Sequence, residues 1–254
     1  MRRLPLFALV ALFVGGSAAD ARHRPTDRIA FARSNNIYVM NADGSGQTPL
    51  TAAGHDASPS WSPDGTQLVF ERTGDVYVMN ADGTAVRNLT NNPAVDIEPA
   101  WSFDGTRIAF RSNRAGDQQV FVMNADGSGQ TQLTFNVGDV QEPGWSPDST
   151  QIVYNAKPNP VTATYDIWVV PAGGGAPVQL TNDPANDQRA AWSPDGTKIA
   201  FVSERDARPE MYLMDADGSD ELRITNNVTA AEYAIQPGRR TARRSHGRTT
   251  IKSG

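Results

Sequence analysis

The sequence contains no cysteine and only three histidines among its 254 residues. Without cysteine, the chain has no disulfide-stapled scaffold, no thiol nucleophile and no cysteine-linked lipid anchor. Only His55 lies between residues 27 and 237, so a histidine-rich metal site cannot be assembled there. The Gly-x-Ser-x-Gly motif of serine hydrolases is also absent. We therefore expect a protein that is not an enzyme and that needs no cofactor.

Long apolar runs are absent as well, and the longest, Leu4 to Val14, is too short to span a bilayer. It follows the positive pair Arg2-Arg3 and precedes a run of small residues that ends at Ala21. This order is typical of a secretory signal peptide. We expect residues 1–21 to be such a signal, and the mature protein to be periplasmic or secreted without a transmembrane anchor.

Positive charge is scarce in the body of the chain, although the formal net charge is only −5. Residues 239–254 carry six basic and no acidic residues, which predicts a basic, disordered tail. Residues 22–238 carry 15 basic and 27 acidic residues, a net charge of −12. This body argues against nucleic-acid binding and favours a basic partner, although solubility alone also explains an acidic surface.

Two short motifs recur along the chain. The first, Trp-Ser-Pro-Asp-Gly or a close variant, begins at Trp61, Trp101, Trp145 and Trp192. The second is Asn-Ala-Asp-Gly, as at residues 41–44, 80–83 and 124–127. Both are turn sequences, and short runs rich in β-branched and aromatic residues separate them. The tryptophans are 40, 44 and 47 residues apart, which is the spacing of propeller blades.

These runs predict an all-β fold, a β-propeller of four-stranded antiparallel blades in residues 22–238. They are apolar on both faces, as expected when blade packs on blade. The count favours five blades over six, with repeat units at 27–51, 58–90, 98–134, 142–181 and 189–225. The first unit lacks its first strand. Residues 231–237 align with that missing strand, so we expect the C-terminal strand to close the ring.

The tandem motif Trp-Ser-Pro-Asp-Gly-x-x-Ile-Ala-Phe, followed by Ile-Tyr-Val-Met-Asn-Ala-Asp-Gly, resembles the TolB-type, WD-like β-propeller repeat over residues 27–237. The resemblance implies the propeller fold and a periplasmic interaction module. The same repeat also occurs in the gating propellers of prolyl-oligopeptidase-like enzymes and in some polysaccharide lyases. The fold by itself therefore does not decide the function.

Strand direction places both recurring turns on one face of the ring, and places the more variable loops on the other. Charged residues precede each blade in these variable loops, near the expected channel mouth. The residues that we expect to bind a partner are Asp56, Asp96, Glu98, Glu142, Asp187, Arg189 and Glu232. Their carboxylates suit the basic residues of a peptide or a cation. The alternative is that they cap backbone N–H groups within the loops.

The sequence thus predicts a monomeric, exported module that binds an envelope or extracellular protein or peptide, and no nucleic acid. The alternative is a propeller that binds or cleaves carbohydrate or cell-wall polymer. Sugar sites commonly carry aromatic platforms, and Phe135 and Tyr165 are the main candidates in the variable loops.

Overall fold

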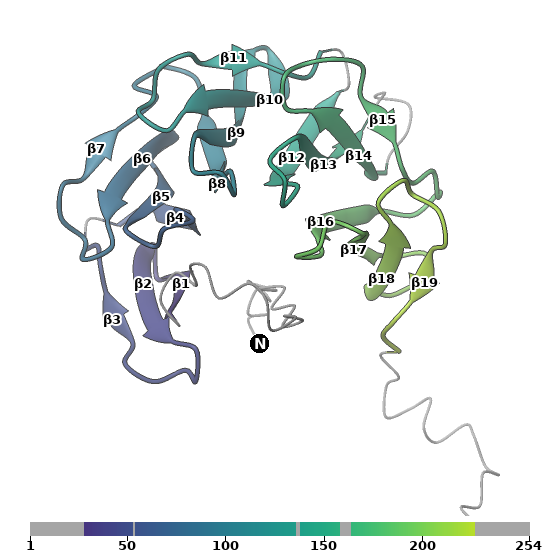
Figure 1. The fold of residues 1–254 in the computed structure, drawn as a ribbon, viewed down its shortest axis with the longest axis horizontal. Helices are drawn as coiled ribbons and strands as arrows, with labels where there is room; N and C mark the ends of the chain where they lie inside the picture. The colour runs from purple at the N-terminus through teal and green to yellow at the C-terminus, as the bar shows by residue number, and fades with distance from the viewer. Residues whose placement is uncertain (1–27, 53, 136–137, 158–163, 227–254) are drawn as a thin grey trace, which may run out of the picture.

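The strands of this computed structural model form five separate antiparallel sheets, which are arranged around a common centre (Figure 1). The structure describes residues 28–52, 54–135, 138–157 and 164–226. Over these residues the chain is all-β, and no helix long and apolar enough to cross a membrane occurs among them. The predicted five-bladed β-propeller is confirmed.

We number the sheets as blades 1 to 5 in chain order. The inner strands, nearest the centre in Figure 1, are β4 (Asp56–Trp61), β8 (Asp96–Trp101), β12 (Asp139–Trp145) and β16 (Asp187–Trp192). The second strands are β1 (Arg28–Arg33), β5 (Gln67–Arg72), β9 (Arg107–Ala115), β13 (Gln151–Lys157) and β17 (Lys198–Ser203). The third strands are β2 (Asn36–Asn41), β6 (Asp75–Asn80), β10 (Asp117–Asn124), β14 (Asp166–Pro171) and β18 (Glu210–Asp215). The short outer strands are β3 (Thr48–Pro49), β7 (Arg87–Asn88), β11 (Thr131–Gln132), β15 (Val178–Gln179) and β19 (Leu222–Arg223).

Blade 1 contains three strands among the described residues, in the order β1-β2-β3, whereas each other blade contains four. The described residues therefore supply no inner strand for blade 1, as the sequence of the first repeat unit predicts. The predicted closing strand (231–237), the signal peptide (1–21) and the basic tail (239–254) lie outside the described residues. All three remain predictions.

The hydrophobic core consists of four clusters, each shared by two neighbouring blades. Phe70, Phe110 and Phe201, at equivalent positions of the second strands, are almost completely buried. Burying one such side chain contributes about 2–3 kcal/mol. A blade that lies between two others is covered on both faces by these neighbours, which explains why its strands lack a polar face.

The recurring Ser-Pro-Asp-Gly turns hold themselves together. In the first, the Gly65 N–H donates to Ser62 O (2.9 Å), and Asp64 accepts bonds from the Ser62 hydroxyl (2.6 Å) and the Thr66 N–H (3.1 Å). Ser149 replaces the turn glycine in blade 4 and adopts its left-handed conformation, with φ at 59°. Turn geometry thus accounts for this motif, as expected.

The Asn-Ala-Asp-Gly turns also pack blade against blade. A Cβ atom on Gly83 would lie 2.8 Å from the Leu50 carbonyl oxygen of blade 1, and one on Gly127 would lie 2.9 Å from the Leu89 oxygen of blade 2. Both glycines have positive φ. These positions require glycine for two reasons, the backbone conformation and the close approach of the neighbouring blade.

Candidate partner-binding face

Three predicted site residues, Asp56, Asp96 and Asp187, are the first residues of inner strands and are almost completely buried. We call them the strand-start aspartates. Each forms an ion pair with an arginine of its own blade: Asp56 with Arg72 (2.6 Å), Asp96 with Arg114 (2.6 Å) and Asp187 with Arg205 (2.9 Å). Our sequence interpretation placed them in loops at the channel mouth. The assignment to loops was wrong, because strand pairing begins at these residues.

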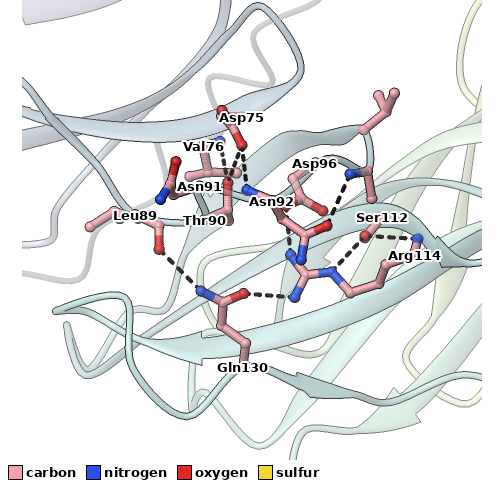
Figure 2. A network of polar contacts seen from close by, with 12 residues as sticks. Asp75, Val76, Leu89, Thr90, Asn91, Asn92, Asp96, Ser112, Arg114 and Gln130 are labelled. Atoms are coloured by element: carbon pink, nitrogen blue, oxygen red, sulfur yellow. Dashed lines mark hydrogen bonds and ion pairs between the residues drawn. The ribbon is translucent and has the colours of Figure 1, made fainter.

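Figure 2 shows the network around one of these pairs. Arg114 bonds to Asp96, to the Ser112 hydroxyl (3.0 Å) and to the Gln130 side chain (2.7 Å). Gln130 in turn donates to the Leu89 carbonyl of blade 2 (3.0 Å). The Arg114 guanidinium also lies 5.4 and 5.0 Å from the ring centroids of Phe110 and Phe121.

The same arrangement of carboxylate, arginine and two aromatic rings recurs in blades 2 and 5. Its members pair with one another and are largely enclosed, so the strand-start aspartates stabilise the blades. The sequence contained a signal for this role, since each arginine follows a core phenylalanine by two or four residues.

A second set, made of three predicted residues and Ser58, lies further along the inner strands. Ser58, Glu98, Glu142 and Arg189 occupy the third or fourth residue of these strands, where a β-bulge interrupts the register. All four have a positive φ between 50° and 58°, which is costly for a residue other than glycine. We call this set the mouth belt, because it lies on the four described inner strands, which are nearest the centre of the ring.

Side chains of the mouth belt bond from one blade to the next. Glu98 accepts the Glu142 N–H (2.7 Å), and Glu142 accepts the Arg189 N–H (3.0 Å). Both glutamates therefore accept backbone N–H groups, but these groups belong to the adjacent blade and not to the loop that the capping alternative named. Both side chains nevertheless remain partly exposed, 26% for Glu98 and 39% for Glu142.

Each glutamate of the belt has an arginine nearby. Arg111 lies 3.4 Å from Glu98, whereas the Arg189 guanidinium lies 3.9 Å from Glu142 and is 46% exposed. Burial raises the pKa of Glu98, an effect that the charge of Arg111 partly offsets. Glu232, the last of the predicted site residues, lies outside the described residues.

A pocket of about 360 Å³ opens beside the belt, where blade 1 meets blade 2. Its lining residues are Asn35, His55, Asp56, Ala57, Glu71, Thr73 and Gly74. Glu71 also accepts a bond from the Ser58 hydroxyl of the belt (3.3 Å). Sequence reasoning missed Glu71 because it sits inside a strand, immediately after the core residue Phe70.

Asp166 is a further buried acid that the sequence did not single out. It opens β14, accepts a bond from Gln179 (3.0 Å) and faces the strand-start aspartate Asp187 of the next blade. Burial, with the nearby charge of Asp187, raises the pKa of Asp166 to about 6. The same causes make this junction sensitive to pH near neutrality.

In blade 3 the segment from 112 to 118, which we expected to be a longer variable loop, mostly extends the β9–β10 hairpin. The two aromatic candidates of these loops also differ from each other. The Tyr165 hydroxyl donates to Asp139 (2.6 Å), and its ring is buried beneath Lys157. Phe135 is 61% exposed. Only Phe135 is therefore available as a platform.

Comparison with protein families agrees with the repeat. The family model of the TolB beta propeller domain matches residues 71–163 and 143–242. The chain belongs to this family. Among curated proteins, none matches this TolB-type propeller.

Solved structures confirm the fold of this TolB-type chain. The putative TolB of Agrobacterium tumefaciens is similar over 78% of this chain and 76% of its own, with 23% identity and a TM-score of 0.69. TolB of Acinetobacter baumannii is similar over 78% of this chain and 53% of its own, with 19% identity and a TM-score of 0.68.

An enzyme shares the architecture as well. An oligogalacturonate lyase in complex with manganese is similar over 78% of this chain and 62% of its own, with 14% identity and a TM-score of 0.62. Within the described residues of the present chain, no group of three His, Cys, Asp or Glu side chains is placed to hold a metal ion. All three similarities concern fold alone.

Proposed function

We propose that this TolB-type propeller is an exported, non-enzymatic interaction module that binds a basic segment of an envelope or extracellular protein. The site is the mouth belt together with the adjoining pocket. The carrying observation is that the Glu98 and Glu142 side chains stay partly exposed at the bulges, while their carboxylates accept backbone N–H groups of the next blade at 2.7 and 3.0 Å.

Rigid carboxylates favour this function for a physical reason. A glutamate fixed by its own hydrogen bonds loses little rotamer entropy when a cation approaches, so more of the electrostatic gain appears as affinity. Glu71 extends the acidic surface into the pocket between blades 1 and 2. The net charge of −12 in residues 22–238 adds long-range attraction for a basic partner.

Export is supported by the predicted signal at residues 1–21, and the interaction role by membership of the TolB propeller family. The carbohydrate alternative has less support at this site, because Tyr165 is buried and bonded to Asp139.

The proposal is tested with fluorescently labelled peptides of equal length, rich in lysine, arginine, glutamate or serine, in anisotropy titrations at 50 and 200 mM salt. We expect the basic peptides to bind, and to bind more weakly at the higher salt. The Glu98→Gln/Glu142→Gln variant should weaken binding about three- to tenfold, since each partly exposed pair contributes about 0.3–0.7 kcal/mol. Equal binding of serine-rich or glutamate-rich peptides, or a response only to oligosaccharides, would contradict it.

A further inference from the structure

We propose that a second pocket, at the rim of blade 3, binds a single lysine or arginine side chain of the partner. This inference rests on the proposed function and extends it to a site away from the mouth belt. The pocket encloses about 260 Å³ and is lined by Ala115, Asp117, Gln119, Gln132 and Phe135. It lies between the β9–β10 turn and the end of β11, on the same face as the belt.

Phe135 gives this pocket an open aromatic surface. Its side chain is 61% exposed, although phenylalanine is usually buried in a core of this kind. The negatively charged face of an aromatic ring attracts a cation within about 6 Å of its centroid. Such a surface therefore suits either an apolar group or a cation, and the polar atoms around it decide between them.

The one charged group beside the ring is a carboxylate. Gln119 is buried and engaged, because it donates to Gly138 O (3.0 Å) and accepts from the Thr134 hydroxyl (2.8 Å). Gln132 donates one amide N–H to Thr134 O (2.7 Å), which leaves its Oε1 atom and its second N–H. The Asp117 carboxylate is exposed and has no partner among the described residues. An aromatic face beside an unpaired carboxylate matches an ammonium or guanidinium group.

The molecule uses this combination internally. In blades 2, 3 and 5 an arginine lies 4.6 to 5.7 Å from the centroids of two aromatic rings and pairs with a strand-start aspartate. The rim pocket supplies an aromatic ring and a carboxylate, but no described cation lies over Phe135. The ligand would supply that missing group.

The probe for this pocket is N-acetyl-argininamide, with N-acetyl-norleucinamide as its uncharged counterpart. Each is titrated into the full-length protein while the NMR signals of the Gln132 side-chain amide and the Asp117 backbone amide are followed. We expect the arginine probe alone to shift both signals. Phe135→Ala and Asp117→Asn should each weaken its binding about two- to fivefold, as expected for a cation–π contact at an exposed site.

Phe103 provides the matched control, because it is 56% exposed but lies in a turn on the opposite face. Phe103→Ala should leave the titration unchanged. Equal shifts with the norleucine probe, shifts with cellotriose instead, or no shift at all would each overturn the proposal. If the arginine probe binds while Glu98→Gln/Glu142→Gln leaves the basic peptides unaffected, the proposed function fails and the rim pocket stands. If Glu98→Gln/Glu142→Gln weakens binding of the basic peptides while the arginine probe does not bind, the rim pocket fails and the proposed function stands.

Discussion

The aspartates of the Ser-Pro-Asp-Gly turns are exposed and bond within their own turns, whereas the strand-start aspartates are buried and bond to arginines at the far end of the next strand. Asp148, in a turn, accepts the Ser146 hydroxyl (2.6 Å), and this bond lowers the pKa of Asp148. Asp96, at a strand start, is neutralised by Arg114. Two sets of acids that both recur along the chain thus differ in their contribution to the fold.

The comparison teaches that recurrence marks a structural requirement, and that its strength depends on burial. A turn aspartate organises four or five residues that water can also solvate. A strand-start aspartate holds a charged side chain between aromatic rings, where water cannot replace it. Neither set combines partial exposure with hydrogen bonds from one blade to the next, as the glutamates of the mouth belt do.

The largest effect is expected for Asp96→Ala, which leaves the Arg114 guanidinium without its counter-charge in a largely buried site. We expect a loss of about 3 kcal/mol in the free energy of unfolding, measured by urea denaturation. The matched change in a turn, Asp148→Ala, should cost about 1 kcal/mol or less. Adding Arg114→Met to the Asp96 variant should recover part of the loss. Equal costs for the two single variants would remove the distinction between the sets.

The second effect concerns blade packing at the Asn-Ala-Asp-Gly turns. Gly83 and Gly44 have nearly the same φ, 87° and 85°, but a Cβ atom would clash with Leu50 O at Gly83 and meet nothing within 4 Å at Gly44. Gly44→Ala should cost about 1 kcal/mol, for the backbone conformation alone. Gly83→Ala should cost about 1–2 kcal/mol more, because the neighbouring blade must move. Thermal unfolding of both variants measures the difference, and equal losses would show that the turn does not hold the neighbour.

The third effect is a pH dependence with opposite signs for buried and exposed acids. The pKa of Asp166 is about 6 in the folded protein, above its usual value of 3.8, so folding becomes more favourable as the pH falls through 6 towards 4. Turn aspartates with lowered pKa values, such as Asp195 at about 2, lose their contribution only in stronger acid. Asp166→Asn should raise the stability at pH 7.5 by about 1 kcal/mol and flatten the rise in melting temperature between pH 7.5 and 5. An unchanged slope would show that Asp166 is not the group responsible.

Much of the fold was predictable because the repeat is expressed in local chemistry. Turn residues such as Pro63 and Gly65 act within four residues, and the empty inner position of blade 1 followed from counting units. The site was less predictable. Asp96 and Glu98 are two residues apart in the sequence, yet one is buried against Arg114 and the other is partly exposed on a bulge. The bulge results from pairing with β9 and contact with blade 4, and no local sequence pattern predicts it.

The most direct test of the central claim removes two charges from either face and compares binding of the same lysine-rich peptide. Glu98→Gln/Glu142→Gln changes the mouth belt, and Asp82→Asn/Asp126→Asn changes the exposed turns of blades 2 and 3 by the same net charge. We predict an anisotropy titration about three- to tenfold weaker for the belt variant, and no change for the turn variant. Equal weakening by both variants would mean that only the overall charge attracts the peptide, and would contradict a site at the mouth belt.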